Sequence, residues 1–388
     1  MILLYLSTPW YADCDFPLIR TFQEKGIDVT YLILLPPFAL RSTLIDIREQ
    51  YPKTGIFPAT IYPELKIYEN YMDMSQVYVA NRTCKSRLTI SYWLDSYYVR
   101  KFIRRGSFDV VHADTLFGGN KKDYYRLAPF VTTFHDPFPH TGEGRKNHLE
   151  CCRMVAELSK GVVLLNGRQK EEFCSMTGLV TSKVLVNSLG VYDNIRAFIK
   201  SDITPRHNNI LFFGRMSPYK GVEYLCRAMV QVREQVPDAT LTIAGGGKMY
   251  FDFTPYEELD YIELYNHYVP MNELAELLSR CELSVCPYTD ATQSGVIMTS
   301  FSLRKPVVAT NVGGLGEMID DGKSGLLVPS KDEKALADAI IALLKNRERL
   351  TAMSEYIHQE YYEGDRSWDA IADKYIEFYE EIIRRNNK

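Results

Sequence analysis

The sequence lacks a long hydrophobic run and any large excess of charge of one sign. The longest apolar run, Tyr31 to Leu40, is far shorter than the roughly 20 residues of a membrane-spanning helix, and two prolines interrupt it. The 45 basic residues stand against 49 acidic ones, and a formal net charge of -4 creates no overall field that would select nucleic acid. We therefore expect no membrane span and no nucleic-acid partner, and any anion site must be local.

Targeting and redox signals are also missing. Apolar residues follow Met1 without a basic region, and Pro9 interrupts them before a signal-peptide cleavage pattern can form. We expect a cytoplasmic protein, at most peripheral at the inner face of the membrane. The eight cysteines form no CxxC pair and have no histidine at zinc-finger spacing, which predicts reduced thiols.

No internal repeat is visible, but short apolar runs alternate with amphipathic stretches, the pattern of βαβ units in an α/β fold. Strands are predicted in the first half at Ile2–Ser7, Val29–Leu35, Val110–Ala113, Phe130–Phe134, Val162–Leu165 and Val184–Asn187. Strands are predicted in the second half at Ile210–Phe213, Thr240–Ala244, Tyr261–Tyr265, Leu283–Cys286, Val307–Ala309 and Leu326–Val328. Two similar sets predict two Rossmann-like, doubly wound lobes facing a central cleft.

The stretch from Asn187 to Asn209, between the two sets, contains Gly190, Pro205 and several Asn and Asp residues, a composition that favours irregular backbone. We place an acceptor-binding lobe at 1–190, a linker at 191–206 and a donor-binding lobe at 207–365.

The segment FFGRMSPYKG follows a predicted strand and precedes an amphipathic helix, Val222 to Val232. Gly214 allows close backbone approach, the helix start offers N–H groups, and Arg215 and Lys220 add two cations. A solvated loop with incidental charges is the alternative, but the loops that follow favour a diphosphate site.

Two more loops follow predicted strands. The second strand of this lobe ends in Gly245 and two further glycines, which alone indicate no more than a turn, and no G-x-G-x-x-G dinucleotide fingerprint is present. In PYTDATQSGVI, Asp290 and Gln293 can hydrogen-bond sugar hydroxyls, and the amides of Ser294, Gly295 and Val296 can meet phosphate oxygens. Capping of the next helix by Asp or Ser is a compatible alternative.

The acceptor side is predicted around FVTTFHDPFPH. Histidine titrates near neutrality, so His135 at the end of a strand is the leading catalytic candidate, with Asp136 beside it and His140 as an acceptor contact. A packed histidine bonded to backbone is the alternative. Trp10, after the first strand, either stacks on an acceptor sugar or belongs to the core. His135, Asp136 and His140 are also metal-ligand types, but two cations already neutralise a diphosphate, so we predict no metal and no cofactor.

Residues 82–105 carry seven basic residues against Asp95 alone, interleaved with aromatic and apolar ones. This composition suits an anionic lipid surface and predicts peripheral membrane contact. An ordinary helix with its apolar face on the sheet and solvated charges is the alternative, which we place slightly ahead.

The ordered motifs FFGRMSPYKG, IAGGG, PYTDATQSGVI, KPVVATNVGGLGEMI and DGKSGLLVPSKD resemble the C-terminal half of the family 4 glycosyltransferases, of GT-B architecture. The D-A-T-Q-S-G-V-I and H-D-P-x-P-H strings resemble one branch of that family. The resemblance implies that Arg215 and Lys220 contact the donor diphosphate, and Gly214, Ser294, Gly295 and Val296 are the further diphosphate contacts that we predict from the loops. It also implies metal independence, retention of anomeric configuration, and a C-terminal helix at 366–388 that crosses back to the first lobe.

One departure concerns the family's two glutamates, which align with Ala291 and Thr299 here. Asp290 is expected to substitute for the first, and Thr299 offers a hydroxyl in place of the second. The donor sugar or nucleoside is expected at Gln293, Thr299, Gly245 and Pro270.

These observations predict a retaining glycosyltransferase of the hexosyltransferase class. It would move a sugar from a nucleoside-diphosphate sugar to a glycan or lipid-linked acceptor, in polysaccharide or glycolipid biosynthesis. The alternatives are a sugar-nucleotide epimerase or phosphorylase on the same fold, and a non-catalytic sugar-nucleotide-binding protein.

Overall fold

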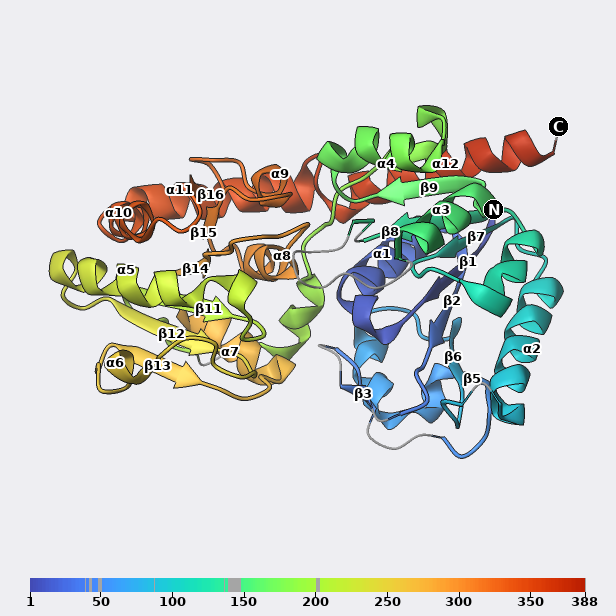
Figure 1. Cartoon of the computed structure of the whole chain (residues 1–388), viewed down its shortest axis with the longest axis horizontal. Coiled ribbons are helices and arrows are strands. Elements are labelled where there is room, and N and C mark those ends of the chain that lie inside the picture. The colour runs from blue at the N-terminus through green and yellow to red at the C-terminus, as the bar shows by residue number, and fades with distance from the viewer. Residues whose placement is uncertain are drawn as a thin grey trace. The chain divides into compact units, whose positions relative to one another are not determined.

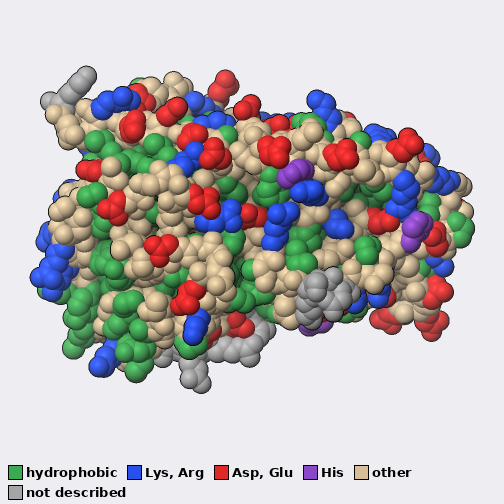
Figure 2. All heavy atoms as spheres, turned by 180° about the vertical axis from the view of Figure 1, so that it is seen from behind, with side chains coloured by type: hydrophobic (Ala, Val, Ile, Leu, Met, Phe, Trp, Pro, Cys, Tyr) green, Lys and Arg blue, Asp and Glu red, His purple; other side chains and the backbone are tan. Residues whose placement is uncertain are grey.

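A computed structural model describes the chain except for residues 39, 42–43, 48–50, 87, 136, 139–147, 200–202 and 388 (Figure 1). The chain divides into two units. The first unit comprises Met1–Leu189 together with Trp368–Lys388, and the second comprises Gly190–Ser367. Acidic and basic side chains mix over the surface seen in Figure 2, as the balanced charge of the sequence predicts.

The first unit is built on a sheet that has eight strands within the described residues, in the order β10-β9-β8-β7-β1-β2-β6-β5. Its strands are β1 Ile2–Ser7, β2 Asp28–Leu34, β5 Gly55–Pro58, β6 Val77–Asn81, β7 Val110–Ala113, β8 Phe130–Phe134, β9 Gly161–Leu164 and β10 Val184–Val186. All pairs are parallel except β5 with β6. A small antiparallel pair, β3 Leu40–Arg41 and β4 Asp46–Ile47, lies outside this sheet. Strands β7, β8 and β9 are buried at every position, as expected for a parallel sheet covered on both faces.

Helices cover this sheet at α1 Ala12–Glu24, α2 Ile90–Arg105, α3 His148–Leu158, α4 Lys170–Thr177 and α12 Trp368–Asn386. The last of these is the C-terminal helix, and the following interactions fasten it to the rest of the first unit. Lys25 forms ion pairs with Asp369 and Asp373 at 2.7 and 2.8 Å. The amide of Asn187 donates to the Ile371 carbonyl at 3.1 Å, and the buried Tyr379 hydroxyl hydrogen-bonds His112 on β7.

The second unit has a parallel sheet, six-stranded in its described part, in the order β13-β12-β11-β14-β15-β16. Its strands are β11 Asn209–Phe213, β12 Thr240–Ala244, β13 Ile262–Tyr265, β14 Leu283–Cys286, β15 Val307–Thr310 and β16 Gly325–Val328. This is the 3-2-1-4-5-6 order of the Rossmann fold, in which ligands bind beyond the carboxyl ends of the strands where the order reverses. That switch point lies between β11 and β14. The corresponding point of the first unit lies between β1 and β7.

Helices of the second unit are α5 Val222–Gln235, α6 Thr254–Glu257, α7 Met271–Arg280, α8 Gly295–Ser302, α9 Leu315–Met318, α10 Glu333–Leu344 and α11 Arg347–His358. Helix α5 buries Val222, Leu225, Cys226, Met229 and Val232, the spacing of one helical face.

The unit boundary differs from the predicted linker at 191–206, because this stretch clusters with the second unit. Its short helix η7, Asp193–Phe198, buries Asn194 and Ile195, and the Tyr192 N–H donates to the Met298 carbonyl at 3.3 Å. The turn-forming residues therefore mark irregular backbone here, but this backbone packs within the second unit and is not a separate linker.

None of the helices in the described ranges is both long enough and apolar enough to cross a bilayer.

Candidate functional site

The donor-side candidates lie at the switch point of the second unit. The loop after β11 carries Gly214, Arg215 and the short helix η8, Pro218–Lys220, before α5 begins. The loop after β14 runs alongside it, since the Thr289 N–H donates to the Tyr219 carbonyl at 2.7 Å. Sequence-predicted residues from two separate motifs are thus brought to one edge of the sheet.

Lys220 is held in an aromatic environment. Its Nζ lies 3.8 Å from the ring centroid of the fully buried Tyr288 and 5.0 Å from that of Tyr219. The pKa of Lys220 is lowered to about 8, mainly by burial; Cys286 opposes this shift and the neighbouring charge of Arg215 contributes to it. Arg215 itself is exposed. An anion bound beside both cations would favour the charged form of Lys220.

The start of α8 adds a further anion-attracting feature. Its N-cap residue Ser294 makes no side-chain capping bond, and its hydroxyl donates instead to the Tyr288 hydroxyl at 3.2 Å. The Ser294 N–H lies 3.3 Å from the thioether sulfur of Met318, which is a weak acceptor. Capping by Ser294, one alternative from the sequence, is therefore wrong, and the first amides of α8, at Gly295 and Val296, keep the partial positive charge of a helix N-terminus.

The remaining donor candidates differ in their burial and in their distance from the switch point. Asp290 and Gln293 are half-buried in the loop between β14 and α8. Thr299 is only 8% exposed, and its hydroxyl donates to the Gly295 carbonyl at 2.8 Å, so its proton is committed within the helix. Pro270 is exposed at the N-cap of α7, after β13, and Gly245 follows β12. In the strand order, β13, which precedes Pro270, lies two strands from β11, and β12, which precedes Gly245, lies next to β11.

Glycines let the loops of this edge pack on one another. A Cβ at Gly245 would lie 1.9 Å from the Gly214 carbonyl oxygen, and one at Gly221 would lie 1.9 Å from that of Pro287. Both have positive φ, 154° and 65°. At these two positions the space that a side chain would occupy is taken by backbone of the neighbouring loop.

We expect Gly221→Ala to destabilise the second unit more than Gly322→Ala. Both positions have positive φ, which costs an alanine about 1–2 kcal/mol, but a Cβ at Gly322 meets nothing within 4 Å. The clash at Gly221 should add roughly 1–3 kcal/mol. Urea unfolding of the two variants measures the difference, and equal midpoints would show that the loop after β14 moves away without cost.

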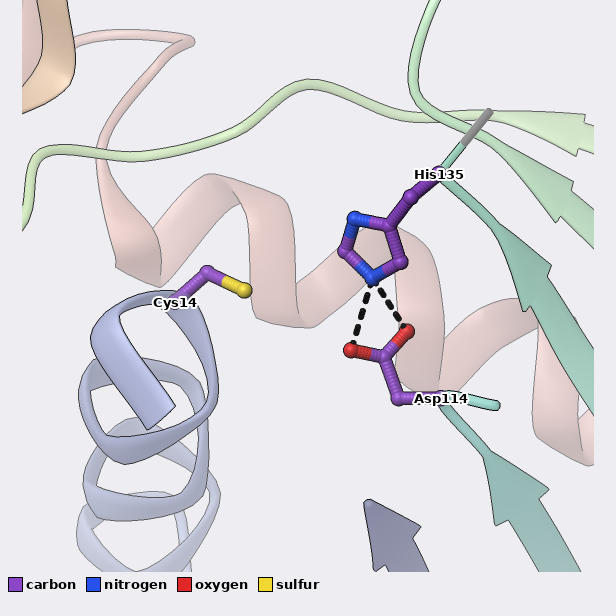
Figure 3. Close-up of side chains that lie close together, drawn as sticks. All are labelled: Cys14, Asp114 and His135. Atoms are coloured by element: carbon purple, nitrogen blue, oxygen red, sulfur yellow. Dashed lines mark hydrogen bonds and ion pairs between the residues drawn. The ribbon is translucent and has the colours of Figure 1, made fainter. Parts of the chain in front are cut away.

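In the first unit, His135 at the end of β8 meets Asp114 at the end of β7 (Figure 3). His135 Nε2 lies 2.9 and 2.8 Å from the two carboxylate oxygens of Asp114, which is 2% exposed. The His135 ring also stacks on Tyr11, with centroids 3.8 Å apart and planes 4° from parallel. His135 is thus fixed by a carboxylate and an aromatic ring, and not by backbone alone.

A second buried carboxylate supports this pair. Burial and the nearby charge of Asp114 raise the pKa of Asp15 well above its usual range, and the Tyr31 hydroxyl donates to Asp15 at 2.9 Å. Burial alone would raise the pKa of Asp114 as well, but His135, through its charge and hydrogen bonds, lowers it. These opposite shifts favour a neutral Asp15 beside an ionised Asp114 that faces His135.

Cys14, Asp114 and His135 place potential metal-ligand atoms within 4.8 Å of one another (Figure 3). Burial raises the pKa of Cys14 well above its usual range, and its thiol donates to the Tyr11 carbonyl at 3.1 Å. A neutral thiol is a poor metal ligand, so the chemistry of the set favours an acid–histidine pair. Asp136 and His140, the other two members of the metal set considered from the sequence, lie outside the described residues.

Trp10 lies in the short helix η1, Pro9–Tyr11, and is 51% exposed, so the core alternative is wrong. Sequence reasoning missed its neighbour Tyr11, and it also missed Asp114. A signal for Asp114 was present, because a carboxylate directly after one predicted strand and a histidine directly after the next lie at the same edge of a parallel sheet.

The donor-side residues lie in a segment that is similar to a known protein family. Residues 207–346 match the family model described as glycosyl transferases group 1. This segment is therefore similar to the group 1 glycosyltransferases. It contains Arg215, Lys220 and the start of α8.

Curated proteins similar to this chain are named glycosyltransferases. The chain is 30% identical over 179 residues to an uncharacterized glycosyltransferase of Methanocaldococcus jannaschii, covering 45% of this chain and 49% of that protein. It is 28% identical over 181 residues to the D-inositol 3-phosphate glycosyltransferase of Corynebacterium urealyticum, covering 44% and 42%. The chain thus matches about half the length of these relatives.

Among solved structures, Anabaena HepE in complex with UDP resembles the whole chain, with a TM-score of 0.61, 16% identity and full coverage of both chains. The fold is that of the GT-B glycosyltransferases, with two Rossmann-like lobes.

Proposed function

We propose that this chain transfers a glycosyl group from a nucleoside-diphosphate sugar to an acceptor hydroxyl, with retention of configuration. The observation that carries the proposal is the pairing of Arg215 with a Lys220 whose pKa is lowered to about 8, at the switch point of a Rossmann sheet. A diphosphate bound there would supply negative charge that compensates the positive charges of both side chains.

The same cations would act in the chemical step. As the bond between sugar and diphosphate breaks, negative charge grows on the leaving group, and Arg215, Lys220 and the first amides of α8 would stabilise it. Asp290 and Gln293, from the loop between β14 and α8, would contact the sugar. The complex of HepE with UDP supports a nucleoside diphosphate as the ligand class.

His135, held by Asp114 and Tyr11, would position the reacting sugar from the first unit, with Trp10 and His140 on the acceptor. We propose a glycan or lipid-linked acceptor and a role in polysaccharide or glycolipid assembly.

Product analysis tests this function. A scan of nucleoside-diphosphate sugars by thermal shift should identify one that raises the melting temperature, since a ligand of the folded state stabilises it. Incubated with that donor, the protein should release nucleoside diphosphate and form a new glycoside, and excess chelator should leave the rate unchanged. Epimerised sugar nucleotide without transfer, phosphate-dependent sugar release, or binding without turnover would each contradict the proposal.

A further inference from the structure

The outward side of α2 is apolar in its first half and basic in its second. Leu88, just before the helix, is 96% exposed, and Ile90, Trp93 and Tyr97 are 77, 59 and 54% exposed. The same side continues to Lys101 and Arg104 at helical spacing. These six residues, together with Arg105, are called the outer α2 face: Leu88, Ile90, Trp93, Tyr97, Lys101, Arg104 and Arg105.

The inward side of α2 shows that this exposure is unusual. It buries Tyr92, Val99 and Ile103, but also Asp95 and Ser96. Lys121 forms a 3.1 Å ion pair with Asp95, so a charge is buried while large apolar side chains stay outside. An ordinary helix whose apolar side packs on the sheet, the alternative considered from the sequence, therefore explains the buried residues of α2 but not its exposed apolar ones. Contiguous exposed apolar residues indicate an interaction surface.

The cations of the outer α2 face are not neutralised within the described chain. Arg100, on the flank of the helix, lies 3.6 Å from Asp123. Among the described carboxylates, by contrast, none forms an ion pair with Lys101, Arg104 or Arg105, and Lys101 lies over the Tyr97 ring at 5.6 Å. Figure 2 shows hydrophobic and basic side chains next to one another at the edge of the first unit where α2 lies. The surface thus offers net positive charge beside apolar groups.

A pocket of about 550 Å³ opens between α2 and β5. Its walls are mainly apolar and aromatic, with Ile56, Phe57, Phe102 and Phe108, and three cations line it: Lys53, Lys101 and Arg105. Two of these cations also belong to the outer α2 face. A pocket of this size with an apolar lining and a few charged groups suits an amphiphile with an anionic group, and not a bare inorganic anion.

We propose that the outer α2 face binds the surface of a bilayer that contains anionic lipid, and that the pocket between α2 and β5 takes part of one such lipid. Trp93 and Tyr97 would lie at the headgroup level, where aromatic side chains are favoured, and Ile90 and Leu88 would enter the acyl boundary. Lys101, Arg104 and Arg105 would meet the lipid phosphates, with Lys53 reaching the phosphate of the lipid in the pocket. None of the residues of this surface belongs to the donor or His135 sites.

Sedimentation with vesicles tests the surface. The protein should bind vesicles of phosphatidylcholine mixed with an equal amount of phosphatidylglycerol, and bind phosphatidylcholine alone weakly. The triple variant Lys101→Glu, Arg104→Glu, Arg105→Glu should lower the partition coefficient by about 100-fold or more. The matched variant Lys66→Glu, Lys160→Glu, Lys183→Glu makes the same charge change elsewhere in the first unit and should bind more nearly like the wild type. Equal losses in both variants, or equal binding to both kinds of vesicle, would overturn the proposal.

Trp93 gives a second readout, since Trp368 is buried and Trp10 can be replaced by Phe. In the Trp10→Phe protein, mixed vesicles should shift the emission to the blue, and the further change Trp93→Phe should abolish the shift. A shift that persists without Trp93, or self-association of the chain in place of vesicle binding, would contradict the assigned face and its occupant.

The pocket has its own test. Dihexanoyl phosphatidic acid, used as a monomer, should bind with a stoichiometry of one in calorimetry, and Lys53→Glu should weaken it at least tenfold, with Lys160→Glu as the control. Inorganic phosphate at the same concentration should not compete. Competition by phosphate, or no binding of dihexanoyl phosphatidic acid, would contradict the proposed lipid site in the pocket.

Discussion

Replacing Arg215 or Lys220 by Ala should lower turnover by about 10²–10³-fold each while the fold survives, as expected when one charge that stabilises the transition state is removed. The two residues supply positive charge where the leaving diphosphate would carry its growing negative charge. Because Lys220 lies on the rings of Tyr219 and Tyr288 without an ion-pair partner among the described residues, its removal should cost little stability. Steady-state kinetics measure the loss, with urea unfolding as the check on the fold.

Lys334→Ala is the matched control, since Lys334 pairs with Asp338 on the exposed side of α10 and should leave kinetics unchanged. Wild-type kcat/KM in both Arg215→Ala and Lys220→Ala would refute the diphosphate assignment.

The pH dependence of donor binding separates the two cations. With a pKa of about 8 in the folded protein, Lys220 is charged below that value and becomes neutral above it. Affinity for a nucleoside diphosphate should therefore weaken as the pH rises through 8. Lys220→Arg should remove this decline, because a guanidinium stays protonated across the range. A decline that is identical in the Arg variant would point to another titrating group.

The second large effect is expected at His135. His135→Ala should lower kcat by about 10²-fold or more, the usual contribution of a positioned histidine in a reacting site. Asp114→Asn should have a smaller effect, since it keeps a side chain of the same shape against Nε2 but removes the charge. The measurement is kcat with saturating donor and acceptor.

His207→Ala tests whether the effect is specific to this histidine, since His207 pairs with Asp238 on the exposed side of the second unit. Full activity of His135→Ala would return His135 to the alternative of a packed, structural histidine.

Much of the donor side was predictable because its chemistry is local in sequence. Each of the six predicted strands of the second unit overlaps an observed one, and Arg215 and Lys220 lie five residues apart in one loop. Short apolar runs of four or five residues specify such strands without help from distant contacts. By contrast, β5 and β6 were missed, since Val77–Asn81 follows a long stretch with no helical pattern and pairs with an antiparallel edge strand.

Contacts between distant residues explain the other misses. Asp114 reads as an ordinary turn residue until β7 and β8 are placed side by side, and Tyr288 reads as part of a polar loop until Lys220 is placed on its ring. The exposed aromatic residues of α2 could not be predicted either. The spacing of these aromatic residues is that of a helix side packed on a sheet. Only the buried ion pair of Asp95 with Lys121 shows that the other side of α2 faces the sheet.

The position of α12 has a consequence for how the protein is made. The ribosome completes residues 1–189 and then the entire second unit before Trp368–Asn386, which belong to the first unit, emerge. Until then, His112 on β7 lacks its partner Tyr379, and Gly161 lacks Phe378 and Ile382, which pack against it. Domains generally fold in the order of synthesis, but here the later unit can finish first. The nascent first unit keeps an apolar surface exposed until α12 is made. It is therefore the part of the chain for which binding of a chaperone would matter most.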